Sequence, residues 1–323
     1  MDTKQLLLII NPISGTGNKQ GLAELVTERM AKIGYTTEVA YTKGRGDATA
    51  LAKSAINRGF TGVLAAGGDG TVNETATALC NSDTALGIIP AGSGNGLARH
   101  LNIPIDPILS LDVISQNNIV ACDYCSANER PFFCTFGMGF DATVSEKFAQ
   151  QQKRGKFMYI KSAVEEYIKY APETYKITAN GTTLTEKALI IACCNASQYG
   201  NNAYIAPSAS ITDGVMDITI VHDGDIFDNT QMCFDLFWGF LDRNTKISTI
   251  KSPSATITRS SEGPVHLDGE PLIMPATIEV KCHHKALKIF IPSKSYKFKP
   301  IITPVNSAWS DFKIAVTNLF KLK

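Results

Sequence analysis

The hydrophobic pattern of the chain changes near residue 120, and this change constrains the fold more than any other feature. Before it, short apolar runs alternate with stretches of helical periodicity. Strands that alternate with helices pair in parallel, because each helix returns the chain to the start of the next strand. The sequence therefore predicts an α/β domain with a parallel sheet. The expected strands are 6–10, 36–41, 63–66 and 86–89, and the expected helices are 19–33, 47–57 and 71–80.

Beyond residue 118 the chain is rich in short strand patterns, which is typical of an antiparallel β-sandwich. The fold class is thus α/β plus all-β. We expect residues 1–120 to form the α/β domain and residues 121–294 the β-sandwich domain, with segment 295–323 returning to complete the first domain. Without a low-complexity linker, the domains are expected to pack with the active site in a cleft between them. The expected strands are 120–125, 132–136, 175–179, 189–195, 216–221, 255–258, 265–267, 278–282 and 287–291, and helices are expected around 157–170 and 227–241.

Composition and charge exclude several classes of protein. Lys and Arg number 31 and Asp and Glu 30, which leaves a net charge of +1 and no overall field that would favour nucleic acid. The early apolar run Leu6–Ile10 is too short for a signal peptide or a membrane span, so we expect a cytoplasmic protein. Cysteines inside apolar runs, such as Cys193 and Cys194, predict reduced and buried thiols.

A glycine-rich loop, Gly67-Gly68-Asp69-Gly70-Thr71-Val72-Asn73-Glu74, follows an apolar strand and precedes a helix. Glycines let backbone N–H groups approach an anion, and the helix start adds its positive dipole end. Asp69 would repel a bare phosphate, so its presence favours Mg²⁺, or water bound to it, between carboxylate and phosphates. The alternative is a tight Gly-Asp-Gly turn without function. The sequence favours a phosphate site.

Two further polar loops follow the carboxyl ends of expected strands, at Asn11–Gly15 and Pro90–Gly96. This edge of an open α/β sheet is where ligands bind, and Thr42, Lys43 and Arg45 add a hydroxyl and two cations to its rim. No Walker phosphate loop occurs in the sequence. Gly137-x-Gly139-x-x-Ala142 nominally matches a dinucleotide fingerprint, but it lies in the β-rich region and we interpret it as a decoy.

The order of these loops resembles the diacylglycerol kinase catalytic-domain family of lipid kinases, which includes sphingosine and ceramide kinases. The resemblance rests on Asn11-Pro12-x-Ser14-Gly15, on Gly67 to Glu74, on Pro90-x-Gly92-Ser93-Gly94-Asn95 and on Leu267-Asp268-Gly269-Glu270. It implies a catalytic group of Glu270, Asp69 and Asp268, with Glu270 as proton acceptor, and a Mg²⁺ site at Ser210, Asp213 and Val215. It also implies nucleotide contacts at Asn11, Pro12, Ser14, Gly15, Thr42, Gly67, Gly68, Asp69, Gly70, Thr71, Val72, Asn73 and Ser93.

The activity that this resemblance implies is in-line transfer of a phosphoryl group from ATP, with Mg²⁺, to a lipid hydroxyl presented at a membrane surface. Diacylglycerol is the first candidate. Many diacylglycerol kinases have Thr and Asp at positions 93 and 96, whereas Ser93 and the small residue Gly96 are similar to sphingosine kinases, so a sphingoid base is the second. An NAD kinase-like activity and a non-enzymatic nucleotide sensor are the alternatives, and a homodimer and peripheral contact with the inner face of the membrane stay open.

An apolar stripe recurs at helical spacing near the carboxyl terminus. It predicts an amphipathic helix that either packs on the α/β domain or docks on a membrane surface, and the sequence leaves both alternatives open. The stripe consists of Val305, Trp309, Phe312, Val316, Leu319 and Phe320.

Overall fold

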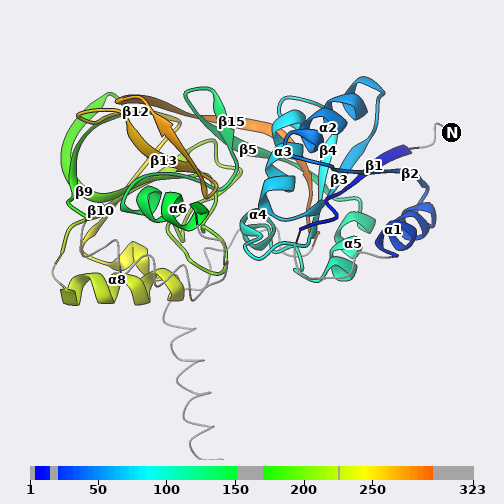
Figure 1. Ribbon diagram of the computed structural model, residues 1–323, viewed down its shortest axis with the longest axis horizontal. Helices are drawn as coiled ribbons and strands as arrows, with labels where there is room; N and C mark the ends of the chain where they lie inside the picture. The colour runs from blue at the N-terminus through cyan, green and yellow to red at the C-terminus, as the bar shows by residue number, and fades with distance from the viewer. Residues whose placement is uncertain (1–3, 15–20, 151–169, 225, 294–323) are drawn as a thin grey trace, which may run out of the picture.

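The computed structural model describes residues 4–14, 21–150, 170–224 and 226–293. Their strands belong to one mixed sheet in the order β14-β13-β7-β9-β8-β12-β15-β4-β3-β1-β2, with β5, β6, β10 and β11 attached off this path. Figure 1 shows two parts side by side: an α/β part made of β1–β4 and α1–α5, and a β-rich part that carries α6 and α8. The predicted combination of a parallel sheet with an antiparallel β-sandwich is confirmed.

The α/β part is a parallel sheet with helices on both faces. Its strands pair in the order β4-β3-β1-β2. Strands β1, β3 and β4 are apolar nearly throughout because helices cover them on both sides, whereas the edge strand β2 carries polar residues and is only partly buried. Helices α2 and α3 pack on one face around Leu7, Ile9 and Val63, while α1 and α5 pack on the other around Leu6 and Leu8. The elements are β1 (Lys4–Ile10), α1 (Leu22–Ala31), β2 (Tyr35–Tyr41), α2 (Asp47–Asn57), β3 (Gly62–Gly67), α3 (Asp69–Leu79), β4 (Ala85–Pro90), α4 (Gly96–His100) and α5 (Pro107–Ser115).

The β-rich part is antiparallel and encloses its own core. The inward residues of its strands, among them Phe136, Ile191 and Val265, alternate with outward ones and form one buried cluster. Its elements, with the two long strands that enter it, are β5 (Ile119–Ala127), β6 (Arg130–Phe132), β7 (Thr135–Gly139), α6 (Phe140–Gln150), β8 (Glu173–Ala179), β9 (Thr182–Cys194), β10 (Met216–His222), α8 (Ile226–Trp238), the short 3₁₀ helix Leu241–Arg243, β11 (Ile247–Ser252), β12 (Ser254–Thr258), β13 (Gly263–Leu267), β14 (Glu270–Met274) and β15 (Thr277–Phe290).

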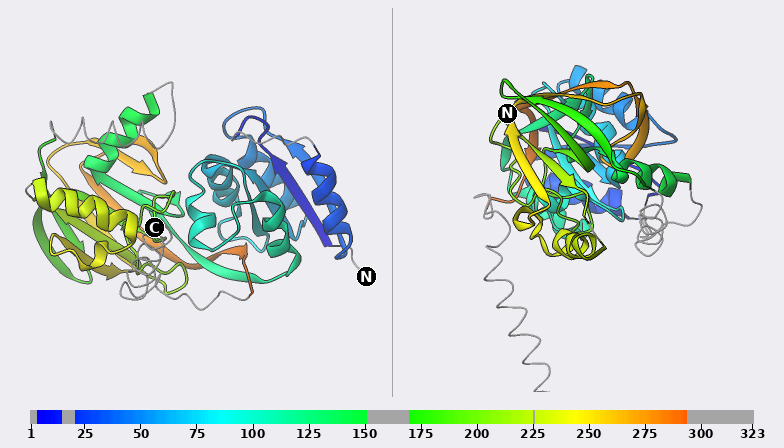
Figure 2. Two further views of the ribbon diagram at one scale, coloured as in Figure 1. Left: turned by 90° about the horizontal axis from the view of Figure 1, so that it is seen from below. Right: turned by 90° about the vertical axis from the view of Figure 1, so that its left-hand side faces the viewer.

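Strands β5 and β15 form an antiparallel ribbon that runs through both parts, as Figures 1 and 2 show. Val280 at one end of β15 belongs to the core of the β-rich part, whereas Leu287 and Ile289 at the other end belong to the core of the α/β part. Ile289 pairs in parallel with Leu86 of β4 and so extends the parallel sheet. The two cores are therefore connected through continuous strands rather than through a linker.

Several sequence predictions need correction. The two strands expected at 278–282 and 287–291 are the single strand β15, whose register shifts between His283 and Leu287. Helix α5 was not expected, although Asp106 caps its first N–H groups and Pro107 follows directly. Residues 157–169 of the helix expected around 157–170, and the carboxyl-terminal segment 295–323 with its apolar stripe, lie outside the described residues. Among the residues that the structure describes, no helix is both long enough and apolar enough to cross a membrane.

Candidate active site

The glycine-rich loops meet at the carboxyl edge of the parallel sheet. Backbone hydrogen bonds join Asn11 N–H to the Ala66 carbonyl at 3.0 Å and Ala91 N–H to the Gly67 carbonyl at 2.8 Å, so the ends of β1, β3 and β4 are in register. The Asn11 amide also donates to the Thr71 hydroxyl at 3.1 Å. The segments that the sequence singled out separately are therefore neighbours in space.

Glycine is required where two of these loops touch. A Cβ atom on Gly92 would lie 2.5 Å from the Gly68 Cα atom of the neighbouring loop, and one on Gly67 would clash with the Thr71 hydroxyl oxygen of its own loop. Helix α3 begins immediately after this contact, and among the described residues no side chain caps its first N–H groups. The first turn of a helix leaves such groups without intrahelical partners. The backbone thus presents N–H donors at a place where side chains are excluded.

The Asp69 carboxylate holds the third loop in place. Its two oxygens accept from the N–H groups of Asn95, at 2.9 Å, and Gly96, at 2.8 Å, where α4 begins. These bonds satisfy donors at a helix start, a position that favours a negative charge. The Asp69 side chain therefore joins the loop after β3 to the loop after β4. Its predicted role in organising Mg²⁺ stays a prediction.

Asn95 helps to shape the site, although it was not among the predicted nucleotide contacts. It is buried and adopts a positive φ of 51°, a conformation that asparagine tolerates better than most residues. Its side chain closes a small ring with Gly92, accepting from the Gly92 N–H at 3.1 Å and donating to the Gly92 carbonyl at 2.8 Å. The signal was present in the sequence, because Asn95 is the last residue of the Gly92-Ser93-Gly94-Asn95 motif.

Glu74 fixes the loop that follows β2. Its carboxylate accepts from the N–H groups of Gly46, at 2.8 Å, and Ala48, at 3.2 Å, at the start of α2. Asp47 in turn accepts from the N–H groups of Lys43, at 2.6 Å, and Gly44, at 3.0 Å. The loop that carries Lys43 and Arg45 is therefore tied by its backbone to α3 and to α2.

Asp268 occupies the turn between β13 and β14 and points away from solvent into backbone donors. It accepts from the N–H groups of Phe133, Cys134 and Thr135 at 2.8, 2.7 and 2.8 Å, and from the Asn73 amide at 2.9 Å. Burial raises the pKa of Asp268, and the three backbone N–H groups oppose that rise. This acid joins α3 to the β-rich part.

Glu270 is the first residue of β14, where it is paired with Leu267 of β13. Asp268 and Gly269 alone form a two-residue turn, with positive φ values of 50° and 85°. The Glu270 carboxylate is 56% exposed and contacts the Arg45 guanidinium at 2.7 Å. Its other oxygen lies 4.0 Å from the position of a Cβ atom on Gly70. The hairpin therefore brings a carboxylate of the β-rich part over the glycine-rich loop of the α/β part.

A buried polar cluster lies behind this hairpin and was missed by the sequence reasoning. His266 Nε2 is 3.0 Å from an Asp141 oxygen, and the Tyr199 hydroxyl donates to that same oxygen at 2.8 Å. The Gly269 N–H donates to His266 Nδ1 at 3.4 Å, which links the cluster to the turn. Asp141 lies within the Gly137-x-Gly139-x-x-Ala142 motif, which we interpret as a decoy. Strand β7, which carries that motif, pairs antiparallel with β9 and β13, so it is not part of a βαβ unit.

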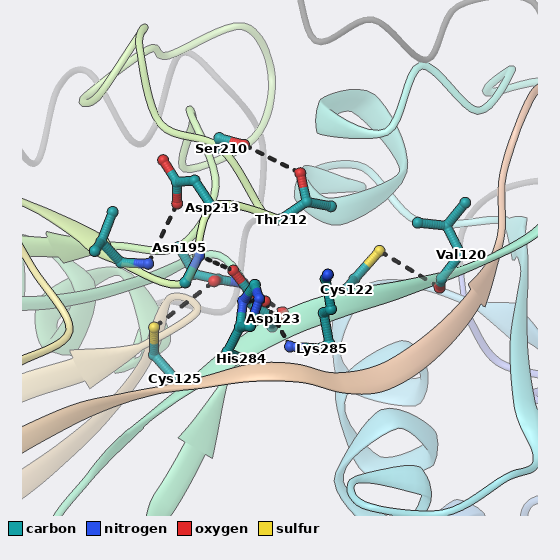
Figure 3. A network of polar contacts seen from close by, with 12 residues as sticks. Val120, Cys122, Asp123, Cys125, Asn195, Ser210, Thr212, Asp213, His284 and Lys285 are labelled. Atoms are coloured by element: carbon teal, nitrogen blue, oxygen red, sulfur yellow. Dashed lines mark hydrogen bonds and ion pairs between the residues drawn. The ribbon is translucent and has the colours of Figure 1, made fainter.

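The residues predicted to hold Mg²⁺ lie in the loop before β10, shown in Figure 3. Asp213 accepts from the Val215 N–H at 3.3 Å and lies 3.5 Å from the Lys251 ammonium group. Ser210 contacts Thr212 at 3.4 Å. Among the described residues, no group of three or more His, Cys, Asp and Glu side chains gathers as a metal site would require. One carboxylate beside a lysine is a weak donor set for Mg²⁺, and this metal site stays a prediction.

The other predicted nucleotide contacts differ in how buried their side chains are. Pro12 and Ser14 belong to the turn after β1, where the Ser14 hydroxyl donates to the Asn11 carbonyl at 3.2 Å. Thr42 is buried and its N–H donates to the Ile10 carbonyl at 3.0 Å, whereas Ser93 is exposed. The Val72 side chain packs in the core of the α/β part. Gly15 lies outside the described residues.

The fold and the site together define a class of two-part α/β and β-sandwich proteins whose glycine-rich loops lie where the parts meet. Two family models match the chain: the diacylglycerol kinase catalytic domain at residues 5–127, and the YegS C-terminal NAD kinase beta sandwich-like domain at residues 135–291. A Pectobacterium atrosepticum protein named "Probable lipid kinase YegS-like" is 30% identical over 290 residues, which cover 85% of this chain and 95% of that protein.

Two further comparisons agree. The diacylglycerol kinase of Bacillus subtilis is 28% identical over 273 residues, covering 83% of this chain and 90% of its own. A crystal structure of a diacylglycerol kinase from Bacillus anthracis aligns with a TM-score of 0.70 at 20% identity, covering 91% of this chain and 98% of that one, which supports the fold. The chain belongs to the diacylglycerol kinase family of lipid kinases, and the family predicted from its motifs is confirmed.

Proposed function

We propose that this protein transfers the terminal phosphoryl group of ATP, bound as its magnesium complex, to a lipid hydroxyl. Diacylglycerol is the first candidate acceptor and a sphingoid base the second. The observation that carries the proposal is the position of Glu270, whose carboxylate lies beside Gly70 at the start of α3. Its support also includes the relatives named lipid kinase and diacylglycerol kinase.

Phosphoryl transfer needs donors that hold phosphate oxygens and a group that accepts the proton of the attacking hydroxyl. In this proposal the N–H groups at the start of α3 bind the phosphates, because the Gly67, Gly68 and Gly92 contacts keep side chains out of their way. Glu270 accepts the hydroxyl proton, since it is exposed on the side of the β-rich part and faces the same loop. The α/β part then supplies the phosphate-binding N–H groups, and the β-rich part supplies the proton acceptor.

The Asp268 side chain has a different task in this mechanism. Its contacts with Asn73 and with three backbone N–H groups keep the turn before Glu270 in a fixed position. We therefore assign it as a positioning residue rather than as a second proton acceptor. The lipid is proposed to reach Glu270 from a membrane surface, which requires peripheral contact between that surface and the protein.

The test is a phosphorylation assay with labelled ATP against diacylglycerol, sphingosine, phosphatidylglycerol and NAD. We expect a labelled lipid, and Glu270→Gln should lower turnover on it by about 10²- to 10⁴-fold. Glu262→Gln is the matched control, because Glu262 is an exposed acid of the same part and should leave turnover unchanged. Labelling of NAD alone would support the NAD kinase-like alternative. Full activity of Glu270→Gln would remove the proton-acceptor role.

A further inference from the structure

Arg45 lies in the loop between β2 and α2. The backbone of this loop is fixed by hydrogen bonds, whereas the Arg45 side chain extends into solvent. Glu74 of α3 binds the N–H groups of Gly46 and Ala48, and Asp47 binds those of Lys43 and Gly44. The Arg45 side chain itself is 84% exposed. Its guanidinium group therefore extends into solvent from an anchored backbone, where it is able to pair with whichever anion lies nearest.

In the part of the chain that the structure describes, the hairpin of β13 and β14 makes two polar contacts of different character with the α/β part. Asn73 and Asp268 form a partly buried hydrogen bond within a set of backbone contacts. Arg45 and Glu270 form an ion pair at 2.7 Å in which both side chains are largely exposed. Exposed ion pairs contribute little to stability because water solvates both partners. The second contact is thus readily exchanged for another while the first keeps the hairpin in place.

We propose that Arg45 exchanges Glu270 for the terminal phosphate of the bound nucleotide. This inference rests on the proposed function, in which the transferred phosphoryl group lies between Gly70 and Glu270. Arg45 contacts the Glu270 carboxylate, so it lies beside that same space. A guanidinium group binds phosphate through two parallel N–H donors and prefers it as a partner of higher charge.

The exchange has a consequence for the proton acceptor. While Glu270 accepts a hydrogen bond from Arg45, one of its oxygens is occupied. When Arg45 moves to the phosphate, that oxygen becomes accessible to an acceptor hydroxyl. Arg45 would then discriminate nucleotides by their terminal phosphate and release Glu270 only when the phosphoryl donor is present.

The test measures the affinities of the full chain for ATP and ADP, each with Mg²⁺, without lipid. Arg45→Ala and Glu270→Gln both break the same ion pair, but only Arg45→Ala removes the phosphate ligand. We expect Arg45→Ala to weaken ATP binding by about tenfold or more and ADP binding by about twofold or less, with Arg45→Lys in between. Glu270→Gln should leave ATP affinity undiminished. Lys43→Ala, which removes the neighbouring exposed cation, is the control for a general charge effect.

Three outcomes would overturn the inference: an unchanged ratio of ATP to ADP affinity in Arg45→Ala, an equal loss in Glu270→Gln, or an equal loss in Lys43→Ala. The second of these would show that the ion pair acts only as a bridge between the parts. Failure of the proposed function is recognised separately, because wild-type protein would then bind no ATP or label no lipid. Thermal unfolding without nucleotide checks that Arg45→Ala is folded, since loss of an exposed ion pair should barely change the melting temperature.

Discussion

Replacement of Asp268 by asparagine tests whether this acid is a positioning residue. Each of its oxygens accepts from two donors: one from the N–H groups of Cys134 and Thr135, the other from the Phe133 N–H and the Asn73 amide. In Asp268→Asn, either choice of side-chain orientation sets an NH₂ group against two donors. The Asn73 amide can turn its oxygen toward that group, but a backbone N–H cannot.

At least one buried backbone N–H therefore loses its acceptor, which costs about 1–3 kcal/mol. Because burial already raises the pKa of Asp268, removing its charge recovers part of that cost. We expect a net loss of about 2 kcal/mol in the free energy of unfolding. For a chain of 323 residues, with an unfolding entropy of roughly 2.1 cal/mol/K per residue, that corresponds to a fall of about 3 °C in melting temperature.

The assay is thermal unfolding of Asp268→Asn beside Glu270→Gln. Glu270 is two residues away in the sequence, but its carboxylate is exposed and forms an ion pair with exposed Arg45, so its replacement should leave the melting temperature within about 1 °C of the wild-type value. An unchanged melting temperature in Asp268→Asn would refute the positioning role, because the four hydrogen bonds would then carry no measurable stability.

Three further predictions concern the loops and helix α4. Asp69→Asn should remove most turnover, because an amide would face the N–H groups at the start of α4; near-normal turnover in a folded variant would contradict this. Gly92→Ala should weaken ATP binding at least about tenfold, since its Cβ atom would force the loops apart, whereas Gly44→Ala, with open space around it, is the matched control. Burial lowers the pKa of His100 from 6.5 to about 3, so on acidification the unfolded chain takes up the proton before the folded protein does. The free energy of unfolding should therefore fall below pH 6.5, by about 2 kcal/mol at pH 5. Unfolding curves measured against pH should show this slope for the wild type and lose it in His100→Gln.

The parallel sheet was predictable because strands β1, β3 and β4 are buried on both faces. Each of these three strands then contains a largely apolar run, and the expected run 63–66 differs from β3 by one residue at each end. The glycine-rich loop was predictable for a similar reason, since it must lie between such a strand and the next helix. Helix α4 was not, because its five residues are too few to show a helical period.

The contacts that assemble the site were beyond a single sequence. Asn73 and Asp268 are 195 positions apart, and Arg45 and Glu270 are 225 positions apart. No local pattern of hydrophobicity or turn residues records such pairs. The motifs indicated that Asn73 and Asp268 matter, but their partners follow only from how the turn between β13 and β14 lies against α3. The same holds for His266, whose sequence neighbours do not predict a buried contact with Asp141.

The acids of the glycine-rich motif posed a physical problem, because negative charge in a loop that binds phosphate should repel its ligand. The structure answers it without requiring a cation at either acid. Asp69 is satisfied by two backbone N–H groups at the start of α4, and Glu74 by two at the start of α2. Each carboxylate is thus directed toward the positive end of a neighbouring helix, which offsets its charge. The N–H groups at the start of α3 then remain the donors for phosphate, and Glu270 is the acid left facing the space where the proposed reaction takes place.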